Sequence, residues 1–359
     1  MHLALLQGDN FRLLQGMTIE PHSRLNLFLG PNAAGKTTVL ESIHCLSRKR
    51  SFRSAQAGDL AGEQGKFWRV AGRFAYEGHP ATKVQVRWVP GEVRLSSDGD
   101  LGLAELSQRF PVQLLEPGQH RLLEDGPAYR RRYLDWGVFH VEPRFFPAWQ
   151  RYQRALRQRN RALKEGGRSA AAFEPELAEA GMLVHRLRMD YLQNFMSPLG
   201  ERIRQLLNTD DWSLDLQRGW RGSADFSECL TQQRERDRRM GQTTEGPHRA
   251  ELRLKMGGET ARNRVSRGQQ KMLIAALVLA QCDQVLERTE VAPVLLVDDL
   301  AAELGSEFQA SLIAALNTYP GQVFVSALEM TAAMESLETG RVFHVEHGRV
   351  VVGSSDRCF

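Results

Sequence analysis

The octapeptide Gly30-Pro31-Asn32-Ala33-Ala34-Gly35-Lys36-Thr37 decides the fold of this 359-residue chain. It matches the pattern G-x-x-x-x-G-K-[ST], follows a strand-like apolar segment (23–29) and precedes a helical one. Glycines in this pattern let backbone N–H groups turn toward phosphate oxygens, and the helix N-terminus adds a partial positive charge. We therefore predict that this loop and Thr38 bind nucleotide phosphates, with the Lys36 amine on the β- and γ-phosphates and the Thr37 hydroxyl on Mg²⁺.

Residues 293–299 (Pro-Val-Leu-Leu-Val-Asp-Asp) supply the carboxylates that a phosphate loop needs. Their four apolar residues predict a buried parallel strand that delivers Asp298 to its carboxyl end, beside the loop. We assign Asp298 to the Mg²⁺ shell and Asp299 to the orientation of the attacking water. The two elements lie about 260 residues apart, which is the spacing that an insertion into one ATPase head would produce. An N-K-x-D motif is absent, which argues against GTP.

The segment Ser266-Arg267-Gly268-Gln269 is a third element of this kind. Ser266 and Gln269 have the spacing of a capping box, so the segment taken alone is equally well explained as the start of a buried helix. Placed between the other two elements, it resembles the S-x-G-Q signature of ABC-type ATPases, whose serine and helix N-terminus hold the γ-phosphate bound to the other subunit. The resemblance implies that Ser266, Gly268 and Gln269 contact nucleotide across a homodimer that encloses two ATP molecules.

The whole chain resembles the RecF family, the bacterial recombination mediators that are SMC-like ATPases. Residues 125–137 are similar to the family's G-x-P-x-x-R-R-x-[FY]-L-D-W-G, residues 246–252 to its G-P-H-R-x-[DE]-L, and residues 298–304 to its acidic strand end and D-loop. Some positions depart from the family pattern. Ala33 replaces a frequent glycine, Gly118 and Gln119 follow Pro117 where acidic residues are common, and Gly305 stands where aspartate is usual.

The resemblance implies a function and a set of catalytic residues. Its cofactors are ATP and Mg²⁺, with Asp299 as the catalytic carboxylate, Ser266 acting on the partner's nucleotide and Gln113 as the Q-loop residue. ATP binding would close a homodimer around DNA and slow hydrolysis would reopen it. The implied partners are double-stranded and gapped DNA at single-strand/double-strand junctions, and RecR and RecO in loading RecA.

Composition narrows the class of protein without deciding its chemistry. Hydrophobic residues make up 42% and charged residues 25% of the chain, which is typical of a globular protein and excludes a collagen-like or mainly disordered one. The net charge of +4 is compatible with a nucleic-acid partner. The longest apolar run, 272–280, is too short to span a bilayer, so we expect a cytoplasmic protein with no membrane partner. Four scattered cysteines indicate neither a zinc site nor a disulfide framework. They are Cys45, Cys229, Cys282 and Cys358.

The pattern of the chain predicts an α/β fold, an ABC/SMC-type P-loop ATPase head interrupted by an all-α arm. The head should combine a sheet that contains parallel strands with an antiparallel N-terminal sheet, because residues 67–76 and 83–89 alternate apolar and polar side chains. We assign residues 1–104 and 209–359 to the head and 105–208 to the arm. Within the arm, a turn near 166–169 predicts an antiparallel pair of helices.

Basic residues concentrate on the predicted arm. Residues 144–164 contain six arginines and one lysine but no acidic residue. Four of the arginines recur at helical spacing, which indicates either a solvated helix face or a surface that contacts DNA phosphates. In a chain that resembles RecF we expect phosphate contacts without base readout. The candidates are Arg151, Arg154, Arg157 and Arg161, together with Arg130 and Arg131 from the family motif.

Three rival classes share parts of this pattern. An ABC-type ATPase coupled to a nuclease would carry a further catalytic domain, but only about 60 residues follow Asp299. A transporter ATPase subunit lacks the long helical insertion. A DNA-binding protein with an inactive site is disfavoured by the intact Lys36, Thr37 and Asp298.

Overall fold

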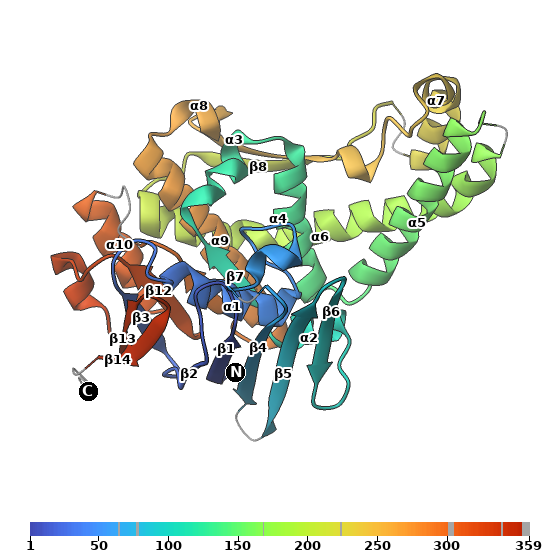
Figure 1. The fold of residues 1–359 in the computed structure, drawn as a ribbon. Helices are drawn as coiled ribbons and strands as arrows, with labels where there is room; N and C mark the ends of the chain where they lie inside the picture. Colours follow the sequence, from blue (N-terminus) through green and yellow to red (C-terminus); the bar gives the residue numbers. More distant parts are fainter. Residues whose placement is uncertain are drawn as a thin grey trace. The chain divides into compact units, whose positions relative to one another are not determined.

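The computed structural model divides the chain into two compact units, Met1–Gln119 with Lys271–Phe359, and His120–Gln270 (Figure 1). It describes residues 1–63, 65–76, 79–167, 169–222, 225–300, 305–338 and 340–353. Among these residues no helix is long and apolar enough to cross a membrane. The predicted D-loop, 301–304, and Cys358 lie outside the described residues. The other three cysteines are buried and form no disulfide within the described part of the chain.

A six-stranded, mostly parallel sheet forms the centre of the first unit, in the order β14-β13-β3-β12-β11-β7. Strands β3, β11 and β12 are buried along their whole length, because helices or other strands cover both faces of a parallel sheet. Only β14 runs antiparallel to its neighbour. The strands are β3 (Leu25–Leu29), β7 (Val112–Leu115), β11 (Val294–Val297), β12 (Val323–Ala327), β13 (Arg341–Glu346) and β14 (Arg349–Val352).

A five-stranded antiparallel sheet forms the other layer of this unit, in the order β2-β1-β4-β5-β6. Its apolar side chains alternate as predicted, since Trp68, Val70 and Phe74 are buried on one face. The predicted antiparallel N-terminal sheet is therefore confirmed. The strands are β1 (His2–Asp9), β2 (Met17–Ile19), β4 (Trp68–Tyr76), β5 (His79–Val89) and β6 (Glu92–Ser97).

Helix α1 (Lys36–Arg48) contacts both sheets of the first unit, through β4, β5 and β12. Its apolar residues Val39, Leu40, Ile43 and Leu46 are fully buried, so the helix is fixed on two sides. The unit also contains η1 (Ala57–Leu60), α2 (Leu103–Arg109), most of α9 (Arg267–Thr289), α10 (Ser306–Asn317) and η5 (Ala332–Ser336). The N-terminus of α1 is therefore held in a set position relative to the ends of the parallel strands.

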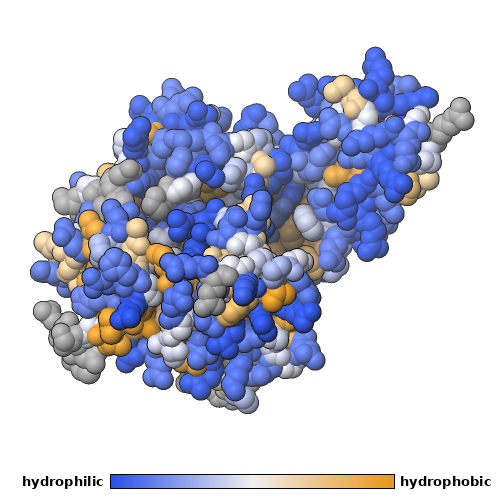
Figure 2. Space-filling model, in the orientation of Figure 1, coloured by the Kyte–Doolittle hydropathy of each residue, from blue (hydrophilic) through white to orange (hydrophobic). Residues whose placement is uncertain are grey.

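The second unit combines helices with a small antiparallel sheet, in the order β10-β9-β8. Helices α5 and α6 pack against each other, which confirms the predicted pair, and hydrophilic residues cover most of the surface of α5 and α7 seen in Figure 2. The main helices are α3 (Arg121–Glu124), α4 (Pro127–Val141), α5 (Phe145–Lys164), α6 (Glu174–Leu207), α7 (Phe226–Met240) and α8 (Ala261–Arg264). The short helices η2 (Pro117–His120), η3 (Ala170–Phe173) and η4 (Pro247–Arg249) join these elements. The strands are β8 (Trp212–Gln217), β9 (Glu251–Met256) and β10 (Glu259–Thr260).

The chain passes from one unit to the other after Gln119 and after Gln270, whereas the predicted boundaries are 104/105 and 208/209. Strand β7 belongs to the central sheet, and α2 is tied to α1 because the Ser107 hydroxyl donates to the Ser47 carbonyl at 2.7 Å. Beyond residue 208, β8, β9 and α7 belong to the second unit. The fully buried Arg159 guanidinium of α5 bonds Asp237 of α7 at 2.7 Å and Glu174 of α6 at 3.1 Å, which joins α7 to the helical pair.

His248 gives the second unit a pH-dependent stability. Its Nδ1 lies 2.6 Å from the Tyr152 hydroxyl and its Nε2 3.1 Å from the Thr243 carbonyl oxygen, an arrangement that fits a neutral ring. Burial lowers the pKa of His248 to about 4. Between this value and the unfolded pKa near 6.5, the unfolded chain binds more protons. The free energy of unfolding should therefore fall as the pH falls through that window, by about 3 kcal/mol at most.

Urea unfolding of the wild type and of His248→Gln, measured from pH 7 to pH 4, tests this expectation. The variant should show a shallower dependence of the unfolding free energy on pH. His44→Gln, in the first unit, should act in the same direction, since burial lowers the pKa of His44 to about 3. If the free energy of unfolding depends equally on pH in the wild type and in His248→Gln, then His248 is not the source of the pH dependence.

Candidate nucleotide-binding site

The phosphate loop joins the carboxyl end of β3 to the N-terminus of α1, as predicted. At Gly30 a Cβ would collide with the Val345 carbonyl oxygen of β13, and Gly35 adopts a left-handed φ of 115° immediately before α1. The Gly348 N–H, from the turn between β13 and β14, donates to the Ala34 carbonyl at 2.8 Å. The loop is thus held by a hairpin that the sequence analysis did not predict.

Ala33 carries backbone strain within this loop. Its φ of 62° lies in the left-handed region, which costs a residue with a Cβ about 1–2 kcal/mol. We expect Ala33→Gly to raise the free energy of unfolding by about 1 kcal/mol, measured by urea denaturation. Ala34→Gly is the control, since buried Ala34 has an ordinary φ and its replacement should destabilise the protein. A loss of stability in Ala33→Gly would contradict the argument.

The Lys36 amine sits at the centre of the loop. Its Nζ donates to the carbonyl oxygens of Gly30 at 2.6 Å and Pro31 at 2.8 Å, and only 9% of the residue is exposed. Burial lowers the pKa of Lys36, and the nearby carboxylates of Asp299 and Asp298 partly offset this shift. A phosphate oxygen that enters the loop can replace these carbonyls as the partner of the ammonium group.

Two oxygen groups that could bind Mg²⁺ meet at the carboxyl end of β11. The Thr37 hydroxyl donates to Asp298 Oδ1 at 2.9 Å, and the Ser326 hydroxyl donates to the same oxygen at 2.6 Å. The Asp299 N–H in turn donates to the Ser326 hydroxyl oxygen at 2.9 Å. Ser326, from β12, therefore orients both aspartates. Its role was not predictable from sequence, because a serine inside an apolar strand carries no motif.

The donor set fits Mg²⁺ bound together with nucleotide. Mg²⁺ keeps several waters and takes one or two protein oxygens plus substrate phosphates. Thr37 and Asp298 supply such oxygens. The described ranges contain no group of three or more His, Cys, Asp or Glu side chains that could hold a metal by themselves. The ion would therefore depend on the phosphates to complete its shell.

A cavity of about 690 Å³ opens over the loop and extends to residues that were not predicted. Arg12 lines it with its guanidinium fixed by the fully buried Glu41, at 2.6 Å from Nε to Oε2. The remaining lining residues outside the loop and the aspartates are Leu13, Arg53, Asp59, Ala61, Gly62, Glu63 and Ser326. Arg12 and Arg53 add positive charge beyond the phosphate loop, on segments that have no recognisable motif.

Gln113 does not line this cavity. In the register of β7 with β11 it pairs with Leu295, whereas Leu115 pairs with Val297 at the end that carries Asp298. Its side-chain amide donates to Gln281 of α9 at 2.8 Å. The geometry gives no support to the predicted Q-loop role, because the residue lies in mid-strand rather than at the carboxyl edge of the sheet.

The predicted signature residues begin α9 within the second unit. The Ser266 N–H donates to Gln269 Oε1 at 2.9 Å, and the Gln269 N–H donates to the Ser266 hydroxyl at 3.3 Å. This reciprocal pair is the predicted capping box. Ser266 and Gln269 are exposed and Gly268 is half-buried, so this helix N-terminus is open to a ligand.

The candidate DNA-binding arginines divide into two groups. Arg130 pairs with Glu251 at 2.6 Å and Arg131 donates to the Ala250 carbonyl at 2.8 Å, so both join α4 to β9. Arg151 bonds two carboxylates of α6, and Arg161 bonds Glu165. Arg154 and Arg157 are exposed and form no ion pair among the described residues.

A strand, a phosphate loop and a helix, with a carboxylate at the end of a strand that lies one place further in the same sheet, define a P-loop ATPase. The signature segment and the second, antiparallel sheet make it an ABC-type head of the kind found in SMC proteins. Residues 2–351 match the family model described as "RecF/RecN/SMC N terminal domain".

Relatives that match almost the whole chain narrow its assignment within this family. A DNA replication and repair protein RecF of Pseudomonas aeruginosa is 38% identical over 98% of this chain and 97% of its own length. The RecF of Pseudomonas fluorescens is also 38% identical, over 98% of each chain. A solved structure of the recombination mediator protein RecF with ATP superposes with a TM-score of 0.86, at 24% identity over 98% of each chain. An Smc head domain from Pyrococcus furiosus superposes at 0.60, covering 99% of this chain and 96% of its own. The chain belongs to the RecF family.

Proposed function

We propose that this protein is an ATP-controlled DNA clamp of recombinational repair and replication in the cytoplasm. ATP and Mg²⁺ join two copies, the closed homodimer holds gapped DNA at its single-strand/double-strand junction, and slow hydrolysis releases it. With RecO and RecR, the bound dimer assists the loading of RecA. The relatives named as replication and repair proteins support this assignment.

One observation carries the proposal. Thr37 and Asp298 are 261 residues apart in sequence and 2.9 Å apart in space, at the mouth of a loop with a buried lysine. This arrangement suits the binding of Mg²⁺ and ATP. The exposed, capped N-terminus of α9 suits a γ-phosphate contact, and in ABC-type ATPases that contact is made to the nucleotide of a second subunit.

We infer that ATP hydrolysis acts as a switch that reopens the dimer, and not as a motor. Asp299 is the exposed carboxylate next to the Mg²⁺ ligand Asp298, and its backbone N–H is bonded to Ser326. Its place beside the phosphate loop suits the orientation of a water molecule. Ser266 and Gln269, whose hydrogen bonds cap α9, would complete the site only when two copies associate, so hydrolysis would be limited by assembly.

Sedimentation and DNA-binding measurements with and without ATP test the proposal. The wild type should dimerise on ATP, and its affinity for gapped duplex should rise with the dimer population. If ATP changes neither assembly nor DNA affinity, the proposed switch is wrong.

The free arginines of α5 provide a separate test of DNA contact. Replacing both Arg154 and Arg157 by glutamate should weaken binding to gapped duplex about tenfold at moderate salt. It should also lower the slope of log affinity against log salt by about two, because two phosphate contacts are lost. Arg151→Ala is the matched control, since Arg151 already bonds Glu176 and Glu179. If the double variant binds gapped duplex with unchanged affinity, this face of α5 is solvated and does not contact DNA phosphates.

A further inference from the structure

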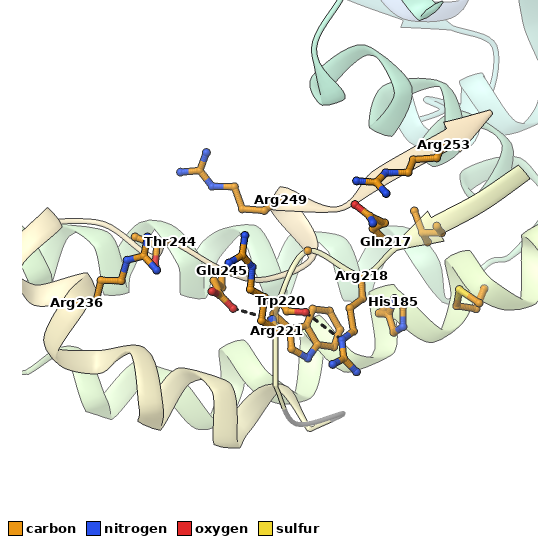
Figure 3. A pocket seen from close by; sticks show the side chains of 13 residues that line it. His185, Gln217, Arg218, Trp220, Arg221, Arg236, Thr244, Glu245, Arg249 and Arg253 are labelled. Carbon is orange, nitrogen blue, oxygen red and sulfur yellow. Dashed lines mark hydrogen bonds between the residues drawn. The ribbon is translucent and has the colours of Figure 1, made fainter. Parts of the chain in front are cut away.

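A hollow of about 750 Å³ in the second unit gathers five arginines that take no part in the ATP site. Figure 3 shows them on three elements. Arg236 comes from α7, Arg218 and Arg221 from the loop after β8, and Arg249 and Arg253 from the segment that enters β9 and from β9 itself. Among the described residues, Glu245 is the only one with an acidic side chain that lines the hollow.

These arginines are not paired within the described part of the chain. None of the five forms an ion pair there, although arginines elsewhere in the unit, such as Arg130, Arg159 and Arg188, bond carboxylates. The single carboxylate, Glu245, is already engaged, since it accepts the Arg221 backbone N–H at 2.8 Å and the Cys229 thiol at 3.4 Å. The hollow thus keeps a positive charge that its own acidic group does not neutralise.

The backbone around the hollow is pinned rather than loose. Gly219, at a φ of 90°, accepts the Gly246 N–H at 2.9 Å, and a Cβ on Gly219 would meet the Ala250 nitrogen at 2.5 Å. Only glycine permits this contact, which joins the loop after β8 to the segment before β9. The same contact fixes the spacing between the side chains that the two segments contribute.

One arginine is preorganised for a ligand. The Arg218 Nε donates to the Trp220 carbonyl at 3.1 Å and its Nη2 to the Gly222 carbonyl at 2.8 Å. Its guanidinium also lies 5.3 Å from the centre of the Trp220 ring. Two of its five N–H donors are used, and the remaining fork is held in one orientation, which lowers the entropy cost of binding an oxyanion.

The shape and lining favour carboxylates on a peptide over nucleic acid. Unpaired bases need exposed aromatic faces to stack on, but Trp220 is only 5% exposed. A hollow of this volume accepts a few side chains, whereas a duplex presents its phosphates on a wide convex surface. The apolar rim residue Met189, 43% exposed, adds a contact for an aliphatic side chain. Arginine forks bind carboxylates in a bidentate manner.

We propose that this hollow binds an acidic segment of a partner protein, with carboxylates on Arg218, Arg236, Arg249 and Arg253. This docking site would be separate from the nucleotide site, so it would work without ATP. The docking site would give a function to Arg249, the arginine of the G-P-H-R motif. Another residue of this motif has a structural function, because the Pro247 carbonyl accepts a hydrogen bond from Arg188 Nη1 at 2.8 Å.

Fluorescence anisotropy with the full chain tests this proposal. The probe is a fluorescein-labelled peptide of repeated Asp-Asp-Leu triplets, and the comparison is the same peptide with asparagine in place of aspartate. The acidic peptide should bind with and without ATP and the asparagine peptide should not. Arg249→Ala with Arg253→Ala should weaken binding at least tenfold, and so should Arg236→Ala with Arg218→Ala, because each pair removes charge-assisted hydrogen bonds.

Arg186→Ala is the matched control, since this exposed arginine of α6 lies next to His185 but outside the hollow. Circular dichroism confirms that each variant is folded. Equal binding of both peptides, or unchanged binding in both arginine pairs, would overturn the proposal. So would an oligothymidylate that binds through these arginines while the acidic peptide does not. The Lys36→Ala variant, which should not bind ATP, should still bind the acidic peptide. The proposed peptide site and the proposed ATP-dependent function can therefore be contradicted independently of each other.

Discussion

Lys36→Ala is expected to lower the affinity for ATP about a hundredfold and to remove every ATP-dependent change in assembly and DNA binding. The lysine ammonium is the buried positive charge of the loop, held by the carbonyls of Gly30 and Pro31. In its absence the backbone N–H groups still face the phosphates, but the charge-assisted contacts to the β- and γ-oxygens are lost. Nucleotide binding is measured with a fluorescent ATP analogue, and assembly by sedimentation.

Lys255→Ala is the matched control, because Lys255 is exposed on β9 of the other unit and lines none of the nucleotide cavity. It should bind ATP and dimerise as the wild type does. ATP-independent DNA affinity should survive in Lys36→Ala, since the arginines of α5 are unchanged. An ATP-induced dimer in Lys36→Ala would mean that the loop is not the switch.

Much of the first unit follows from local patterns in the sequence. The phosphate loop, the strand at 294–297 and the antiparallel meander each carry their own periodicity or motif. Strand β1 does not, because its register shifts between Leu3 and Leu5, and this bulge breaks the alternation that predicts a strand. Strand β7 has only four residues and lies between α2 and η2, so its pattern is too short to distinguish it from the predicted helical arm.

The predicted arm boundaries differ from those of the two compact units for a similar reason. Helix α7 is almost entirely polar, and it is anchored by three buried side chains near its start, Phe226, Cys229 and Leu230. Its other anchor is the ion pair of Asp237 with Arg159. Such a contact between distant segments leaves no periodic signal.

Site residues that belong to a motif were predictable from the sequence. Site residues that only the fold brings near the phosphate loop were not. Lys36, Thr37 and Asp298 come together as predicted. Ser326 and Arg12 enter the site only because their segments lie beside the loop in space. For the basic stretch at 144–164, the sequence pattern indicates more unpaired charge than the fold leaves. The stretch itself contains no acidic residue, but carboxylates of α6 and α7 pair with Arg151 and Arg159 in the structure.

Asp299→Asn is expected to slow ATP hydrolysis by a factor of about 10²–10³ while ATP affinity changes by less than about twofold. An amide has no negative charge with which to orient and deprotonate the attacking water. Asparagine tolerates the left-handed φ of 54° at this position, so the backbone and the hydrogen bond to Ser326 should persist. Phosphate release gives the rate, and the variant dimer should remain on gapped DNA long after the wild type has dissociated.

Asp298→Asn separates the roles of the two adjacent carboxylates. Because Asp298 accepts both the Thr37 and the Ser326 hydroxyls, its loss should weaken the binding of ATP with Mg²⁺ itself, and higher Mg²⁺ should partly restore it. Added Mg²⁺ should not rescue Asp299→Asn, whose defect lies after binding. If Asp299→Asn instead hydrolysed ATP at the wild-type rate, the water would have to be oriented by another group, and the exposed N-terminus of α9 from a second copy would be the first to examine.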